Sequence, residues 1–407
     1  MDLYKINTKY DKTVSTLARA FGICESDVRN AITRSYVFDA DETNNRLRRV
    51  LCKAARGEAI TVAGIGGSIT EGAHAKCWGD IGNNAKEYTE ELGGERCWFQ
   101  RTVDWFKEQF PDTQVNSINA GIGATSSFLG TFRLEQMVLS HKPDLITVEF
   151  SVNDPTAIPN LLKDEILEAY ESIVRRCLEA GIAVMQVFLV QQQGNSMQDY
   201  HMEIANHYNV PAISYHNAVY PDGKPICDWV RLSPDDIHPN NAGQALLGTC
   251  VTNYLDLVLE NTDLNAEYEL DELHTSWIYF DTFNKLHAEY AYEFCDRARG
   301  GFQFFEDIPD VCYKWKGALV SDNNEGSIKL NVAKGAKRVF VQYFNSNGSF
   351  ETDFMGLKSS CNTSPTGWPK AMWHRVYTGK AIDEDSTITI KSHKSGRVIL
   401  QGLLIAF

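Results

Sequence analysis

The stretch AITVAGIGGSITEG, residues 59–72, decides the fold. Its first part, residues 59–65, is a short apolar run typical of a β-strand, and a glycine-rich turn containing Ser68 follows it directly. A serine between a strand and a helix stands at the carboxyl end of the strand, where parallel sheets bind their ligands. The amino terminus of the following helix favours developing negative charge. The stretch therefore predicts an α/β sheet with a polar site at its edge.

The glycines around Ser68 do not match other motifs that place a reactive group after a strand. The sequence is not GxSxG, so an α/β-hydrolase nucleophile elbow is not supported. No lysine precedes the serine, as a phosphate-binding loop requires, and the glycines lack the GxGxxG spacing of a dinucleotide site. Taken alone, GGSIT indicates little more than a tight turn.

The chain around this stretch alternates between two kinds of pattern. Short apolar runs occur at residues 59–65, 115–118, 145–150, 182–189 and 210–214. Helical patterns separate or follow them at residues 98–110, 127–140, 161–180, 196–208 and 240–259. Such alternation predicts βαβ units and a parallel sheet with helices on both faces. The runs are apolar throughout, as in strands that are buried on both sides.

The pattern changes after about residue 261. Alternating short runs appear at residues 327–332, 338–343, 387–391 and 397–406, separated by Gly, Asn and Ser. They predict a C-terminal antiparallel β-sandwich. We therefore expect three segments: an N-terminal segment of unassigned role (residues 1–45), an α/β catalytic domain (46–262) and a β-sandwich accessory domain (263–407).

Composition excludes several classes of partner. The net charge of −14 disfavours nucleic acid, whose phosphates are neutralised by Lys and Arg, and also disfavours anionic membranes. No apolar run reaches the roughly 18 residues of a membrane span. The histidines are dispersed and no HExxH occurs, so we expect neither a metal nor another cofactor. The N-terminal residues lack the apolar segment of a secretory signal and the ten cysteines form no CxxC pair, so we expect a cytoplasmic protein with reduced thiols.

Polar groups follow the next two apolar runs as well. The second run ends in SINAGIGATSS, where Gly121 and Gly123 let backbone amides approach a ligand closely. The third ends in VEFSVNDP, with the amide side chain of Asn153. Each has an alternative reading as an ordinary turn or helix cap. Three successive strand ends that carry a serine, a glycine amide and an asparagine amide favour a common site.

The segment RLSPDDIHPNNAG, residues 231–243, supplies a base and an acid just before the last helix of the α/β domain. Asp235 lies three residues before His238, close enough to hold the imidazole through Nδ1 while Nε2 faces the serine. A serine hydroxyl needs such a base to become a nucleophile at neutral pH. Nine other histidines lack this context.

These blocks, in this order, resemble the SGNH (GDSL-like) hydrolase superfamily over about residues 60–259. The resemblance implies a flavodoxin-like three-layer α/β/α domain. It also implies that Ser68 is the nucleophile, that His238 is the general base and then acid, and that Asp235 orients it.

The resemblance further implies an oxyanion hole formed by the Ser68 amide, the side chain of Asn153 and the amide of Gly123, with Gly121 as the alternative glycine. Two positions depart from the family pattern. The usual Asp before the nucleophile is Gly67, and the usual Gly of the GxND block is Ser151. The first departure also occurs in carbohydrate-esterase branches, so it favours a sugar ester.

Members with an appended β-sandwich that resembles a carbohydrate-binding module are commonly carbohydrate acetylesterases, so the expected substrate is an acetylated oligosaccharide or polysaccharide fragment. Three tryptophans are candidate sugar contacts: Trp78, in a loop that ends at Trp98, and Trp368 and Trp373, in a Ser/Pro/Gly-rich segment at 359–375. We expect residues 368–374 to form a loop at the rim of the active site. For each tryptophan the alternative is core packing.

Three other functions remain open on the sequence. The same acyl-enzyme could pass its acyl group to a sugar hydroxyl, which would make the protein an O-acyltransferase. A small-molecule esterase or thioesterase is a third reading. A non-enzyme alternative is an inactive carbohydrate-binding protein that keeps the fold.

Overall fold

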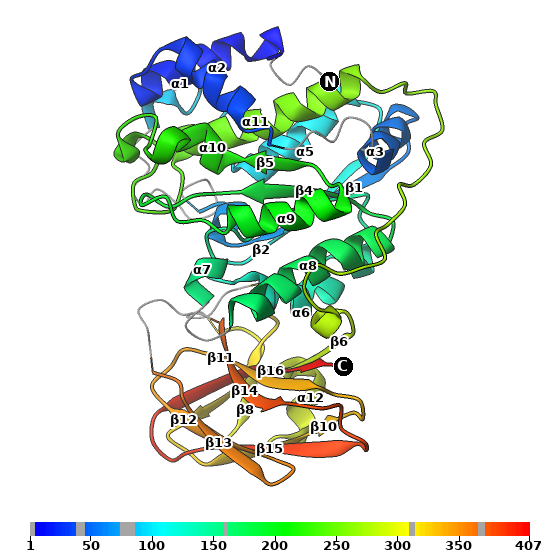
Figure 1. The fold of residues 1–407 in the computed structure, drawn as a ribbon. Coiled ribbons are helices and arrows are strands. Elements are labelled where there is room, and N and C mark those ends of the chain that lie inside the picture. Colours follow the sequence, from blue (N-terminus) through cyan, green and yellow to red (C-terminus); the bar gives the residue numbers. More distant parts are fainter. Residues whose placement is uncertain (1–4, 38–44, 74–85, 158–161, 309–313, 365–370) are drawn as a thin grey trace. The chain divides into compact units, whose positions relative to one another are not determined.

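A computed structural model describes residues 5–37, 45–73, 86–157, 162–308, 314–364 and 371–407. The chain divides into two compact units (Figure 1). The first comprises Met1–Ile122 and Ser126–Tyr279, and the second comprises Gly123–Thr125 and Phe280–Phe407. Each unit is described separately.

The first unit is built on a five-stranded sheet in the order β2-β1-β3-β4-β5. All neighbouring strands are parallel. This is the flavodoxin-like order, so the predicted α/β fold is confirmed. The strands are β1 (Ile60–Gly66), β2 (Val115–Gly121), β3 (Leu145–Glu149), β4 (Ala183–Phe188) and β5 (Ala212–Ser214).

Helices cover both faces of this sheet (Figure 1). In β1, Ile60 and Val62 pack in the core of one face, whereas Ala63 and Ile65 pack in the core of the other. The first core includes residues of α1 (Asp11–Phe21), α2 (Glu25–Arg34), α3 (Asn45–Ala55), α5 (Trp98–Gln109), α10 (Tyr215–Val219) and α11 (Asn241–Glu260). The second includes residues of α6 (Ser127–Met137), α8 (Lys163–Glu179) and α9 (Gln198–Tyr208).

The N-terminal helices belong to this unit. Gly22 ends α1 in the left-handed conformation, with φ 68°, where glycine has no steric penalty. This accounts for the interruption in the apolar pattern. The hydroxyl of Tyr10 donates to Asp256 of α11 at 2.7 Å, and the amide of Asn7 donates to Asn253 Oδ1 at 2.8 Å. Residues 5–37 thus pack on the helix that follows the His238 segment.

The end of the first unit lies beyond the expected boundary at residue 262. The carboxylate of Glu171 in α8 accepts the backbone amides of Ile278 and Tyr279 at 2.8 and 2.9 Å. These bonds fasten the segment after α11 to the α/β unit. Within the described parts of the chain, no helix is long and apolar enough to cross a membrane.

Short elements complete the description of the chain. Three helices of four residues are α4 (Ser68–Glu71) and α7 (Asp154–Ala157) in the first unit and α12 (Ala291–Phe294) in the second. The 3-10 helices are η1 (Thr8–Tyr10), η3 (Lys86–Tyr88), η4 (Leu139–His141), η5 (Pro221–Gly223), η6 (Trp229–Arg231), η7 (Asp281–Phe283) and η8 (Cys295–Arg297).

The second unit consists of two antiparallel sheets, which confirms the predicted β-sandwich. One has the order β13-β12-β15-β10-β7, with β13 (Leu357–Asn362), β12 (Ser349–Phe354), β15 (Ser386–Ser392), β10 (Gly326–Val332) and β7 (Arg299–Gly300). The other has the order β14-β11-β16-β9-β8, and β6 also pairs with β16; its strands are β14 (Ala371–Thr378), β11 (Arg338–Phe344), β16 (Arg397–Ala406), β9 (Ala318–Asp322), β8 (Gln303–Phe305) and β6 (Leu286–Tyr290).

Candidate active site

Ser68 occupies the turn that the sequence predicts. It follows β1 and is the first residue of the short helix α4 (Ser68–Glu71), with 5% of its surface exposed. The helix ends after one turn because Gly72 adopts a positive φ of 111° and donates its amide to the Ser68 carbonyl at 3.0 Å. The first amides of a helix have no partner within it, so the Ser68 N–H is not needed by α4.

The structure brings together Ser68, His238 and Asp235. The Ser68 hydroxyl lies 2.8 Å from His238 Nε2, and His238 Nδ1 lies 2.8 Å from Asp235 Oδ2. With the proton on Nδ1, the imidazole donates to Asp235 and accepts the serine proton at Nε2. These three groups therefore form a continuous hydrogen-bonded chain, in which His238 can take the serine proton while Asp235 holds the imidazole.

Backbone bonds fix the loop that carries this acid and base. Asp235 Oδ1 accepts the amides of Ile237 and His238 at 2.9 and 2.7 Å, so the second carboxylate oxygen is held as well. The hydroxyl of Ser233 lies 2.5 Å from the His238 carbonyl, and the Trp229 indole donates to the Asp235 carbonyl at 2.6 Å. The imidazole is thus positioned by its own loop before any substrate binds.

Asn153 lies directly over the residue that precedes the nucleophile. A β-carbon on Gly67 would be 2.2 Å from Asn153 Oδ1 and 2.8 Å from its Cγ. An Asp at residue 67, the usual family residue, would therefore collide with this amide. In this backbone, the side chain of Asn153 occupies the space that a side chain on residue 67 would take.

The other departure, Ser151, has a structural role. Its buried hydroxyl accepts the Leu189 amide at 2.6 Å, which joins the end of β3 to the end of β4. Nearby, Asp154 Oδ1 accepts the Ser127 amide at 2.8 Å and thereby fixes the start of α6. The SVND segment consequently ties together three elements at the carboxyl edge of the sheet.

The two candidate glycines differ in their surroundings. The Gly121 amide already donates to Asn119 Oδ1 at 3.0 Å. A β-carbon on Gly121 would lie 2.4 Å from the amide nitrogen of Glu71, so glycine is required there for close packing on α4. Gly123 lies two residues beyond the end of β2, and its role as an oxyanion donor stays a prediction.

A buried carboxyl group that the sequence patterns do not single out lies behind the nucleophile turn. Glu149 is the last residue of β3 and is fully buried. Its Oε2 accepts the Thr70 hydroxyl at 2.9 Å and the Gly67 amide at 3.3 Å. Burial raises the pKa of Glu149 to about 7. The signal in the sequence is a single acid within the apolar run LITVEF.

Arg133 is a second buried charge near the turn. From α6 it donates to the carbonyls of Gly66, at 3.0 Å, and Ala120, so it bridges the carboxyl ends of β1 and β2. Its guanidinium also lies over the ring of Phe150, 5.9 Å from the centroid. A charged residue within a helical pattern gives no sequence signal that separates this role from an exposed one.

The three tryptophans predicted to contact a sugar, and Trp98 at the end of the first loop, differ in where the structure places them. Trp78 and Trp368 lie outside the described residues. Trp98 begins α5 and is fully buried in the first core, so it packs in the interior. Trp373 is half-buried on β14, whose bounds show that residues 371–374 form a strand instead of the expected loop.

Comparison with known proteins agrees with this arrangement. Residues 64–246 match the GDSL-like Lipase/Acylhydrolase family. The matched segment begins in β1 and ends in α11, and it contains every predicted residue of the serine site. Over these residues the α/β unit is similar to the GDSL-like hydrolases. The description of the matched family, lipase and acylhydrolase, denotes hydrolysis of ester bonds. No protein with a curated description matches the chain.

Two solved structures resemble this GDSL-like protein over both units. One is a two-domain esterase active on acetylated mannans, crystallised with mannopentaose. It is 25% identical, the match covers 89% of this chain and 94% of that one, and the TM-score is 0.68. The second structure of a two-domain esterase active on acetylated mannans is 24% identical, with coverage of 92% and 98% and a TM-score of 0.73.

Proposed function

We propose that this GDSL-like protein is a serine esterase that removes acetyl groups from acetylated carbohydrate through an acyl-enzyme on Ser68. The observation that carries the proposal is the pair of 2.8 Å contacts that links Ser68 to His238 and His238 to Asp235. A nucleophile, a base and an orienting acid within hydrogen-bond reach are what acyl transfer by serine requires.

In the first half of the reaction, Ser68 Oγ attacks the acetyl carbonyl carbon while its proton passes to His238 Nε2. The imidazolium that forms is stabilised by Asp235, which keeps its bond to Nδ1. The tetrahedral intermediate collapses when the bond between the acetyl carbon and the sugar oxygen breaks, and His238 returns the proton to that oxygen. The sugar leaves with a free hydroxyl, and the acetyl group remains on Ser68.

The negative charge of the intermediate needs donors that are already in place. We assign these to the Ser68 amide, the Gly123 amide and the side-chain amide of Asn153. The position of the Asn153 side chain against Gly67, the residue before the nucleophile, supports the choice of Asn153, and Gly123 is the glycine donor that the family resemblance implies.

In the second half, His238 takes a proton from water, which attacks the acetyl-Ser68 carbonyl. Acetate leaves, and the proton on Nε2 returns to Ser68. A sugar hydroxyl in place of water would give transfer instead of hydrolysis, so the two outcomes differ only in the acceptor.

The substrate class rests on the 25% identical esterase, whose activity is on acetylated mannans and which matches nearly the whole chain. The half-buried Trp373 and the polar β-sandwich are compatible with a sugar substrate. The acidic surface, with its net charge of −14, favours a neutral polymer over a polyanion.

The test is acetate release from acetylated glucomannan and acetylated xylan, compared between the unchanged protein and Ser68→Ala. The proposal expects release by the unchanged protein alone, and a mass increase of one acetyl group on the Ser68 peptide after rapid quenching. Acetate release by Ser68→Ala, or release from 4-nitrophenyl acetate but from neither polysaccharide, would contradict it. Adding a free acceptor sugar and looking for its acetylated form separates hydrolysis from transfer.

A further inference from the structure

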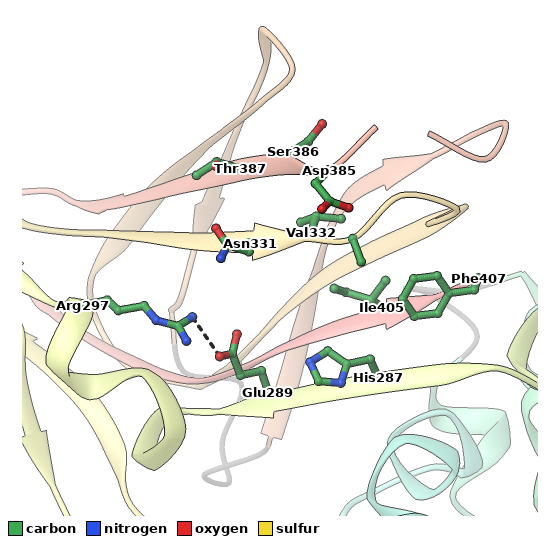
Figure 2. A pocket seen from close by; sticks show the side chains of 11 residues that line it. His287, Glu289, Arg297, Asn331, Val332, Asp385, Ser386, Thr387, Ile405 and Phe407 are labelled. Atoms are coloured by element: carbon green, nitrogen blue, oxygen red, sulfur yellow. Dashed lines mark ion pairs between the residues drawn. The ribbon is translucent and has the colours of Figure 1, made fainter. Parts of the chain in front are cut away.

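The β-sandwich unit contains a hollow between the margins of its two sheets, here called the margin pocket (Figure 2). Its volume is about 670 Å³, within the range of roughly 300–1,000 Å³ typical of small-molecule sites. The lining comes from β6, η8, β10, β15 and β16 and from the residues that adjoin them, all within the second unit. The pocket is therefore a property of this unit alone.

One wall carries polar side chains on a face that is otherwise apolar. In the register of β6 with β16, Glu289 lies opposite Leu403 and His287 lies opposite Ile405. Leu403 and Ile405 are buried in the sandwich core, so the side chains of His287 and Glu289 are on the same inner face. Polar residues on the inner face of a sandwich are unusual. Along each strand, apolar side chains that face the core normally alternate with polar side chains that face outward.

Polar groups on both sides of the pocket are held in place by bonds within the protein. Glu289 Oε1 lies 2.8 Å from Arg297 Nη1, which fixes an acceptor beside a donor. Across the pocket, Asp385 Oδ1 accepts the Lys334 amide at 2.8 Å. Because these side chains are already held, little free energy is lost in ordering them when a ligand binds.

The opposite wall offers hydrogen-bonding groups that the protein does not use. Asn331 and Thr387 face each other on β10 and β15, and both side chains are exposed. Neither side chain makes a hydrogen bond to any residue in the described ranges. Figure 2 shows Asn331 on the strand across the pocket from the Arg297–Glu289 pair.

Apolar surface lies between these two walls. Ile405 and the ring of Phe407 occupy the space between the β10 and β6 sides in Figure 2, and Val332 adjoins them. The pocket thus combines an apolar strip with acceptors and donors on both sides. A pyranose ring has the matching character, because each hydroxyl donates and accepts while the ring carbons present an apolar face.

Charge narrows the choice of ligand. Glu289 is paired with Arg297, and Asp385 adds a second carboxylate to the lining, which disfavours phosphates, sulfates and uronic acids. Charged and polar side chains flank the apolar strip, which disfavours an acyl chain. We propose that the margin pocket binds a neutral sugar residue of the polysaccharide that the enzyme deacetylates, as a subsite within the second unit. This inference rests on the proposed function for the identity of its ligand.

Binding is tested with the full chain carrying Ser68→Ala, so that the probe is not hydrolysed. The probes are glucomannan and xylan, both soluble and without acetyl groups, and retardation in native gels containing them gives the dissociation constant. The test variant is Asn331→Ala/Thr387→Ala, which removes one cross-strand pair from the pocket. The matched control is Lys329→Ala/Thr389→Ala, the next pair along the same two strands and outside the pocket.

The expected result is retardation by at least one polysaccharide, a dissociation constant raised about three- to tenfold in the test variant, and no change in the control. Arg297→Met, which leaves both strands unaltered, should give a similar loss, and circular dichroism checks the fold of each variant. Equal affinities for test and control variants, or no retardation of any of them, would overturn the subsite. Acetate release by the unchanged Ser68 protein is measured separately, so a failure of the proposed function is recognised independently of the pocket.

Discussion

The side-chain amide of Asn153 occupies the space that a side chain on residue 67 would need. An added β-carbon at Gly67 would lie 2.2 Å from Asn153 Oδ1, and Asn153 is itself 8% exposed with little room to move. The position of the Asn153 amide, the proposed oxyanion donor, therefore depends on the absence of a side chain at residue 67.

This contact predicts the effect of Gly67→Ala. The methyl group should displace the Asn153 amide and lower kcat by about tenfold or more, whereas KM changes little, because the amide acts mainly on the transition state. Steady-state kinetics on an acetyl ester measures both constants. If Gly67→Ala keeps full kcat, Asn153 does not need its present position.

Asn153→Ala tests the same donor directly. Loss of one oxyanion donor costs about 10²–10³-fold in kcat. We expect a fall in kcat of that size with a smaller change in KM. The double variant with Gly67→Ala should be little worse than Asn153→Ala alone, because both changes act on one group; additive losses would argue that Gly67 acts separately.

Ser68→Ala and His238→Ala should each lower kcat/KM by at least about 10³-fold, because the nucleophile and its base act as one unit. The thermal unfolding midpoint should stay close to that of the unchanged protein. His216→Ala is the control, since this histidine lies on α10 and outside the serine site. Equal losses in His216→Ala and His238→Ala would show that the assay does not report on the site.

Glu149→Gln should remove a pH dependence of stability. Burial raises the pKa of Glu149 from 4.5 to about 7, so the folded state holds a proton that the unfolded state releases over this range. The folded protein therefore loses stability as pH rises from about 4.5 to 7, by about 3 kcal/mol from this group. The glutamine in the variant cannot ionise and can still accept the hydrogen bond from Thr70. The free energy of unfolding of the variant should therefore fall by about 3 kcal/mol less over this pH range.

The measurement is the free energy of unfolding in urea at pH 5 and pH 8, followed by tryptophan fluorescence. Glu108→Gln, at an exposed position of α5, is the matched control and should behave as the unchanged protein does. Parallel pH profiles for all three proteins would contradict the assignment of this dependence to Glu149.

Much of the fold is visible in the sequence because it is encoded locally. The apolar runs that form β1 and β3 are buried on both faces, and short runs of this kind between turn residues are typical of covered parallel strands. The Asp235–His238 pair is likewise local, since three residues separate its members. By contrast, β12 (SFETDF) and β13 (LKSSCN) carry too many polar residues to stand out as strands.

The rest of the site depends on contacts between distant segments. Glu149 reaches the amide of Gly67 across 82 positions, and no pattern within LITVEF indicates that partner. The same holds for the contact between Gly67 and Asn153. The Ser, Pro and Gly residues before Trp373 favour a loop, although its own segment, AMWHRVYT, has the aromatic and β-branched residues of a strand.

The packing of the N-terminal helices on α11 sets a limit on where this protein can be cut. Asp256 is almost fully buried and is satisfied by the Tyr10 hydroxyl at 2.7 Å, the Lys9 ammonium at 2.6 Å and the Trp105 indole at 2.9 Å. An expression boundary near residue 46, the expected start of the catalytic domain, would delete two of these partners and uncover the apolar residues beneath α1 and α2. A recombinant fragment that begins near residue 5 should remain soluble, whereas one that begins near residue 46 should aggregate.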